Sequence, residues 1–162
     1  MTNHPKFHPF GKRSRQIAVG TTNRAVIYTR VSTKEQADTN QSLDLQEKKC
    51  QEYAIARNYI VVQHFGGTYE SAKTDGRKEF VRMLTFVQQK SNGISHIIVL
   101  SPDRFSRTGG DAISLTAELR RAGVAVETVT QQADTRTAAG RFMQDLGFVM
   151  SHFGVQIGPS WE

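Results

Sequence analysis

The chain has 162 residues, 38% apolar and 22% charged, which is the composition of one globular domain with a full-sized core. Its formal charge of +6 favours a polyanionic partner, although an inert basic surface explains the charge equally well. A single cysteine, Cys50, excludes an internal disulfide and a CxxC metal site and favours a cytoplasmic location, and no segment has the length of a membrane span or the pattern of a secretory signal.

The chain begins with residues 1–23, which hold prolines, glycines and basic residues but no acidic residue. We expect a disordered basic arm there. Apolar runs then alternate with amphipathic stretches. They predict strands at 25–28, 59–65, 97–100 and 124–129, and helices at 42–57, 77–89, between the loop 103–110 and Gly123, and at 138–153. This order predicts an α/β fold of three layers: a central, mostly parallel sheet of about four strands with helices on both faces.

The last predicted helix carries a narrow apolar stripe with 3-4-3-4 spacing. Its members are Ala139, Phe142, Leu146, Val149 and Phe153. The spacing favours a helix that docks on its own sheet, and it is also that of a coiled-coil-like seam between copies of the chain.

The first predicted strand leads into the segment YTRVST at 28–33. Because side chains alternate along a strand, Arg30 and Ser32 point to the same side. A hydroxyl beside a guanidinium suits attack on a phosphodiester, since the arginine holds a phosphate oxygen, and Ser32 is the candidate nucleophile. An alternative stays open, because STKE at 32–35 is also a capping box, in which Ser32 is a helix N-cap.

The third predicted strand leads to Asp103, Arg104 and Arg107. Two interpretations stay open. In the first, the two guanidiniums bind a phosphate and Asp103 orients one of them; in the second, Asp103 caps the next helix and the arginines are solvated. Because Arg104 follows a strand end, we expect it at the surface, where Arg104→Ala removes cleavage without affecting the fold. Arg77, at the start of a predicted helix, is a further candidate for the same cleft.

Signatures of other site classes are lacking in the sequence. The five histidines have no ligand spacing and no acidic cluster suits a two-metal nuclease, so we expect no metal. Neither GxGxxG nor GxxxxGK[ST] is present, which disfavours a nucleotide-binding module.

Three blocks of sequence carry a family resemblance. They are YTRVST at 28–33 with Gln36 and SLDLQ at 42–46, IVLSPDRFSR at 98–107, and TAAGRFM at 137–143. In this order they resemble the serine recombinases, the group of resolvases, invertases and large serine integrases. The match runs from about residue 25 to residue 153 and implies a resolvase-like fold that ends in a long C-terminal helix, here cut short.

The resemblance implies a role for each matching residue. Ser32 becomes the nucleophile that forms a 5′-phosphoserine link to DNA, and the arginines around the scissile phosphate are Arg30, Arg104 and Arg107. Asp103 becomes their acidic partner. Further DNA-binding or phosphate-binding positions are Gln36, Gln46, Arg77 and Arg141. The implied partners are DNA and further copies of the chain, as a dimer and a synaptic tetramer, without a metal or another cofactor.

The sequence departs from the family after Phe153, where Gly154 and Pro159 stand in place of a continuing helix. We therefore expect a catalytic domain at 24–153, an atypical tail at 154–162 and no DNA-binding domain. The implied activity is site-specific DNA recombination. The alternative is an inactive remnant that only binds DNA or other subunits.

Overall fold

The computed structural model describes residues 22–30, 42–67, 75–106 and 108–154, with the backbone alone at 75–77. Its sheet holds four strands in the order β2-β1-β3-β4, and every neighbouring pair is parallel. The strands are β1 (Arg24–Thr29), β2 (Ile60–Gly66), β3 (His96–Val99) and β4 (Ala125–Thr128). The predicted parallel α/β sheet is thus confirmed. Nearly all of the predicted arm, 1–23, and of the predicted tail, 154–162, lies outside the described residues.

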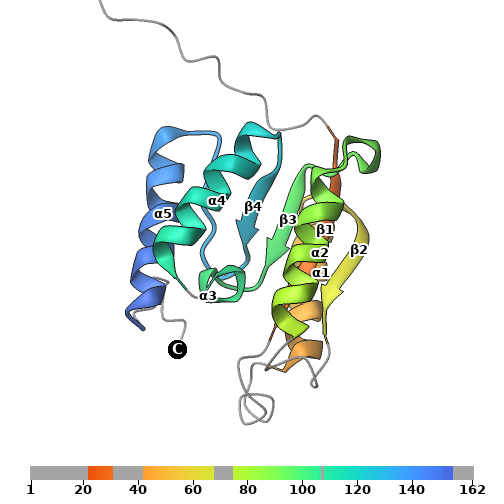
Figure 1. The fold of residues 1–162 in the computed structure, drawn as a ribbon, viewed down its shortest axis with the longest axis horizontal. Coiled ribbons are helices and arrows are strands. Elements are labelled where there is room, and N and C mark those ends of the chain that lie inside the picture. Colours follow the sequence, from red (N-terminus) through yellow and green to blue (C-terminus); the bar gives the residue numbers. More distant parts are fainter. Residues whose placement is uncertain (1–21, 31–41, 68–74, 107, 155–162) are drawn as a thin grey trace, which may run out of the picture.

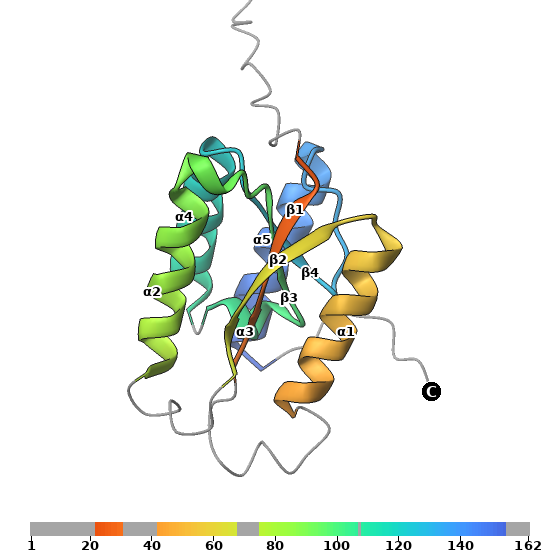
Figure 2. The same cartoon turned by 90° about the vertical axis from the view of Figure 1, so that its right-hand side faces the viewer.

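Helices cover both faces of the sheet and give the three layers that the sequence predicts (Figures 1 and 2). They are α1 (Leu43–Ala56), α2 (Asp75–Gln88), the short 3-10 helix η3 (Lys90–Asn92), α3 (Pro102–Phe105), α4 (Gly109–Arg121) and α5 (Ala138–His152). In Figure 2, α1 lies on one side of the sheet, and α2 and α4 lie on the other. Helix α5 packs beside α4 and α3.

The predicted loop at 103–110 is wrong at both ends. The single turn of α3 occupies Pro102–Phe105, and α4 already begins at Gly109. Proline is favoured in the first turn of a helix, because its fixed φ suits the turn and its missing N–H would have no partner there. Ser101 precedes it in an extended conformation. Asp103 and Arg104 are therefore held in a helical turn instead of an open loop.

Strand β1 lies in the centre of the sheet and is buried on both faces. Val26 and Tyr28 belong to the core under α2 and α4, whereas Ala25 and Ile27 pack under α1 with the buried Cys50. The alternation of these side chains is that of an extended strand with apolar layers on both sides. It carries the backbone in a fixed direction to Thr29, the last residue of the strand, and places Arg30 at the carboxyl edge of the sheet.

Helix α5 docks on its own fold, but by a different face from the stripe seen in the sequence. Gln144 is 6% exposed and donates from Nε2 to the carbonyl of Val126 in β4 at 2.7 Å. Phe148 is buried in the core, while Phe142 and Phe153 of the stripe are 65% and 72% exposed. Of the stripe, Ala139, Phe142 and Phe153 therefore remain exposed on the described fold, while Leu146 and Val149 are half-buried.

None of the helices in the described ranges has the length and apolar character that a bilayer span requires.

Candidate functional site

The candidate site lies at the carboxyl ends of β1 and β3, two neighbouring parallel strands. Arg30 directly follows β1, and the turn of α3 that follows β3 carries Asp103 and Arg104. Ligands of parallel α/β sheets collect at this edge, because the loops that leave the strands converge there. The fold thus brings together two of the sequence segments in which we predicted site residues.

Arg30 and Arg104 bind one another's backbone. Arg30 Nε donates to the carbonyl of Arg104 at 3.1 Å, and Arg30 Nη2 donates to the carbonyl of Asp103. In return, Arg104 Nη1 donates to the carbonyl of Arg30 at 3.2 Å. Both guanidiniums therefore stay within hydrogen-bonding distance of the same two chain segments, and each one fixes the position of the other.

Gln46 of α1 holds the same strand end from the side. Its Nε2 donates to the carbonyl of Arg30 at 3.0 Å, and its Oε1 accepts from the backbone N–H of Arg30 at 3.3 Å. The side chain is fully buried. The amide thus takes the place of a neighbouring strand and extends the pairing of β1 by one residue beyond its end.

Arg104 is buried, at 3% exposure, so the expectation of a surface arginine is wrong. Its Nε lies 3.4 Å from Oδ2 of Asp103, and the other carboxylate oxygen accepts from the hydroxyl of Ser101. The physical reason is the α3 turn, which packs against β1 and directs Arg104 toward the carbonyl of Arg30. A charge at this depth is retained only with such partners, which makes Arg104 part of the structure as well as of the site.

Several predicted site residues lie outside the described part of the chain. Ser32, Gln36 and Arg107 are among them, as is the side chain of Arg77 at the start of α2.

Arg141 is described, and it lies apart from the cluster. Its Nη1 donates to the carbonyl of Arg136 at 3.1 Å and is 3.4 Å from that of Thr135. Thr135 and Arg136 line a cavity next to His96 and Ala125, the first residues of β3 and β4. The structure thus places Arg141 toward the amino ends of the strands, whereas Arg30 and Arg104 lie at the carboxyl ends.

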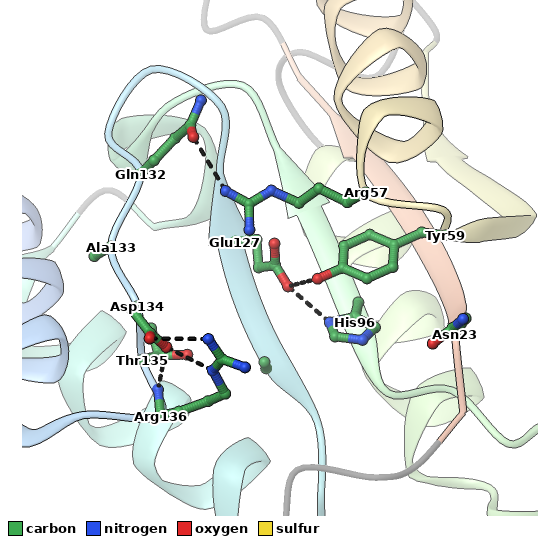
Figure 3. Close-up of a pocket in the computed structure, with 11 residues that line it drawn as sticks. Asn23, Arg57, Tyr59, His96, Glu127, Gln132, Ala133, Asp134, Thr135 and Arg136 are labelled. Carbon is green, nitrogen blue, oxygen red and sulfur yellow. Dashed lines mark hydrogen bonds and ion pairs between the residues drawn. The ribbon is translucent and has the colours of Figure 1, made fainter.

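The cavity has a volume of about 450 Å³ and is separate from the arginine cluster (Figure 3). On its floor lies Glu127, 11% exposed. The carboxylate accepts hydrogen bonds from the hydroxyls of Tyr53 and Tyr59 at 2.7 and 2.8 Å, and it lies 2.7 Å from Nδ1 of His96.

Burial alone would raise the pKa of Glu127, but the bonds from His96 and the two tyrosines outweigh the effect of burial and hold the pKa below its usual value. Burial and the bond to Glu127 raise the pKa of Tyr59 to about 12.

Glu127 contributes to the stability of the native state, and this contribution is lost in acid. A carboxyl whose pKa is lowered by folding stabilises the native state above its ordinary pKa of 4.5, and this contribution is lost as the pH falls through the lowered native value. We expect Glu127→Gln to cost about 2 kcal/mol near neutral pH and progressively less as the pH falls below 4.5. Urea unfolding of both proteins over a series of pH values from neutral to acid measures the difference. An equal cost at all of these pH values would show that the charge is irrelevant.

The sequence analysis gave Gln46 only the DNA-binding or phosphate-binding position that the family resemblance implies, and it missed the contact with the backbone of Arg30. The signal was present: Gln46 shares the buried face of α1 with Leu43 and Cys50, three residues before it and four after it. A glutamine on an apolar stripe needs partners for both amide atoms, and the only polar groups beneath that face belong to the backbone or to other buried polar side chains. This signal predicts that Gln46 binds the backbone of the sheet, without showing which residue.

The comparisons with known proteins agree with one another. The sequence model of one family, described as "Resolvase, N terminal domain", matches residues 25–156. A resolvase family site-specific recombinase from Streptococcus pneumoniae is 26% identical, with a TM-score of 0.65 over 76% of this chain and 83% of that chain. The C-terminal catalytic domain of ISC1926 TnpA, an IS607-like serine recombinase, is 25% identical, with a TM-score of 0.52 over 76% and 78%.

A third solved structure is similar over most of its length. The N-terminal catalytic domain of TP901-1 integrase is 23% identical, with a TM-score of 0.64 over 81% of this chain and 96% of that chain, a likeness that extends to the fold alone. No curated protein gave a significant match.

Proposed function

Because this chain belongs to the resolvase N-terminal domain family, the catalytic domains of serine recombinases, we propose that it cleaves and rejoins DNA at a specific site through a covalent phosphoserine intermediate. Ser32 is the proposed nucleophile. Arg30, Arg104 and Arg107 are the proposed phosphate-binding residues, with Asp103 as their acidic partner.

The observation that carries the proposal is the convergence of Arg30, Asp103 and Arg104 at the ends of β1 and β3, held by mutual hydrogen bonds. Ser32 lies two residues beyond Arg30 in the chain. Two residues of backbone span at most about 7 Å, and this short connection between Arg30 and Ser32 supports the proposal that the two act together. Fixed positive charge close to a hydroxyl favours attack on a phosphodiester rather than on an acyl carbon, where a histidine base is expected.

In the proposed reaction, Ser32 Oγ attacks phosphorus, the bond from phosphorus to the 3′ oxygen breaks, and the hydroxyl proton is passed on so that a free 3′-OH is left. The guanidiniums stabilise the additional negative charge of the pentacoordinate transition state. Religation reverses the step, with a 3′-OH of the recombining partner as nucleophile. The phosphoserine bond retains the energy of the phosphodiester, so the cycle needs no external energy source.

Covalent trapping tests this function. A DNA substrate that is nicked beside its crossover site loses a short strand on cleavage and traps the protein on DNA. We expect a protein–DNA adduct from the wild-type chain and none from Ser32→Ala, because alanine lacks the attacking oxygen. Denaturing gel electrophoresis with a labelled DNA strand measures the adduct.

The control variant is Ser151→Ala, which removes a hydroxyl from the last turn of α5 and should leave the adduct yield unchanged. If neither the wild-type chain nor any variant forms an adduct on the matched site, the chain is not a recombinase. It then serves only as a DNA-binding or subunit-binding module.

We propose that DNA and further copies of the chain are the partners, and that α5 carries the contact between copies. Phe142 and Met143 are 65% and 44% exposed on the outer side of α5, and Phe153 just beyond it is 72% exposed. Apolar side chains at helical spacing, with their inner neighbours already docked, form a surface that a second helix covers favourably.

Phe142→Glu is expected to weaken self-association by at least about tenfold in dissociation constant, because it places a charge in an apolar contact. Sedimentation equilibrium over a range of protein concentrations measures it, and circular dichroism should show an unchanged fold. Ile55→Glu is the matched control, since Ile55 is 72% exposed on α1. Equal association of wild type and Phe142→Glu would exclude this surface from the contact.

A further inference from the structure

Three polar side chains near the arginine cluster have no part in the function proposed above. Thr29 is the last residue of β1, His64 belongs to β2, and Glu47 belongs to α1. Thr29 Oγ1 lies 2.9 Å from His64 Nε2, and His64 Nδ1 lies 3.5 Å from Glu47 Oε2. The three groups form a line from hydroxyl to imidazole to carboxylate, which crosses from the sheet to the helix that covers it.

The two contacts of His64 differ in kind. Thr29 Oγ1 and His64 Nε2 are at hydrogen-bond distance, and the tautomer of the ring sets which of the two donates. His64 Nδ1 and Glu47 Oε2 are within ion-pair distance, and the carboxylate can only accept. Thr29 is fully buried, and a buried hydroxyl without a partner is costly. His64 thus provides the hydrogen-bond partner that the buried hydroxyl of Thr29 needs, and Glu47 orients the imidazole ring of His64.

This line is not a catalytic triad. The Thr29 hydroxyl has no exposure to solvent and so cannot meet a DNA phosphate in this structure. Along β1 the side chains alternate, so Thr29 shares the α1 face with Ile27, while the guanidinium of the next residue, Arg30, binds the carbonyls of the α3 turn. The line therefore acts on the position of the strand end and not on the substrate.

Two consecutive residues of α1 hold two consecutive residues at the end of β1. Gln46 binds the backbone of Arg30 directly. Glu47 acts on Thr29 through His64. On the other side, β2 packs tightly against the end of β1. Gly66 pairs with Thr29, and a Cβ atom on Gly66 would lie 1.9 Å from the carbonyl oxygen of Thr29. The end of β1 is thus fixed from α1 and from β2 before the chain reaches Arg30.

We propose that His64 is a positioning residue, which fixes the end of β1 through the Thr29 hydroxyl and thereby sets the position of Arg30 for phosphodiester cleavage. This inference rests on the proposed recombinase function. Small displacements of a positioned group lower a reaction rate strongly even where binding is unchanged. The line should therefore affect the rate of cleavage and not the affinity for DNA.

Two pairs of substitutions separate the bonds of His64. The amide of His64→Gln reaches the position of Nε2 and keeps the bond to Thr29, whereas His64→Asn ends near Nδ1 and keeps only the contact with Glu47. Thr29→Val removes the hydroxyl at constant shape, and Thr29→Ser keeps it. We expect adduct formation at saturating DNA to slow about tenfold in His64→Asn and Thr29→Val, and to stay within about twofold in the other two. The DNA concentration at half-maximal rate should not change in any of them.

A second measurement needs no DNA. The backbone N–H of Arg30 donates to Gln46, so its hydrogen exchange, followed by NMR, reports on how firmly the strand end is held. Exchange at Arg30 should accelerate about tenfold in His64→Asn and Thr29→Val only. Lys48→Ala, at the exposed position after Glu47 in α1, is the control and should change neither rate.

The outcomes separate this inference from the proposed function. If the wild-type chain forms no adduct, the function fails, and the exchange rates alone decide whether His64 holds the strand end. If His64→Asn cleaves DNA at the wild-type rate and the N–H of Arg30 exchanges in it at the wild-type rate, the inference is overturned. Equal slowing in His64→Gln and His64→Asn would also overturn it, since the bond to Thr29 would then be irrelevant.

Discussion

Arg104→Ala is expected to reduce DNA cleavage by about 100-fold or more and to lower the free energy of unfolding by about 2 kcal/mol. The loss of activity follows from removing a guanidinium that we propose binds the scissile phosphate. The loss of stability follows from burial: Arg104 is 3% exposed, and its removal leaves the carbonyl of Arg30 with one donor fewer and Asp103 without its ion pair. Asp103 is 46% exposed, so solvent compensates for part of that loss.

Adduct formation and urea unfolding of the same preparations measure the two effects. Arg121→Ala is the matched control, because Arg121 is exposed at the end of α4 and its loss should change neither quantity. Arg104→Met, which fills the space without the charge, should recover part of the stability and none of the activity. An unchanged unfolding curve for Arg104→Ala would show that the burial of Arg104 does not contribute to the fold.

Arg30→Lys is expected to slow adduct formation by about 100-fold although the charge is kept. The planar guanidinium of Arg30 reaches two carbonyls at once, those of Asp103 and Arg104, through Nη2 and Nε. An ammonium is a point charge with a different reach and cannot reproduce this fork. The cross-link between β1 and α3 is then lost, together with the geometry of the positive charge that we propose acts with Ser32.

Arg24→Lys is the control for this substitution. Arg24 begins the same strand, and its Nε also donates to a backbone carbonyl, that of Asn92 at 2.9 Å, but at the opposite end of the sheet. The rate of cleavage by Arg24→Lys should equal that of the wild type. If Arg30→Lys also cleaves at the wild-type rate, positive charge alone is sufficient at this position and the fork has no role.

Most of the fold was predictable from local patterns. The strand at 25–28 is a continuous apolar run, and Ala25 to Tyr28 are indeed buried on both faces of the sheet. Such patterns report burial reliably, because apolar groups leave water wherever a periodic element allows it. The exception was 103–110, where a single helical turn has too few residues to produce a periodic pattern.

The candidate site was predictable only as a set of residues. The motifs around Arg30 and Arg104 indicated which side chains are candidates, because residue chemistry is local information. How the two arginines are used was not predictable, since each one binds the backbone of a segment more than seventy positions away. Gln46, Thr29 and His64 owe their roles to contacts of the same kind, between elements that are distant in the chain.

The sequence by itself determined the order of strands and helices, the parallel sheet and the identity of the arginine cluster, because hydrophobic periodicity and side-chain chemistry depend on neighbours along the chain. Only the tertiary structure decided that Arg104 is buried, that α5 docks through Gln144 and Phe148 and leaves Phe142 exposed, and that His64 binds Thr29. These are properties of packing. Burial and hydrogen bonding are set by which groups meet across the core, and a linear pattern does not contain that information.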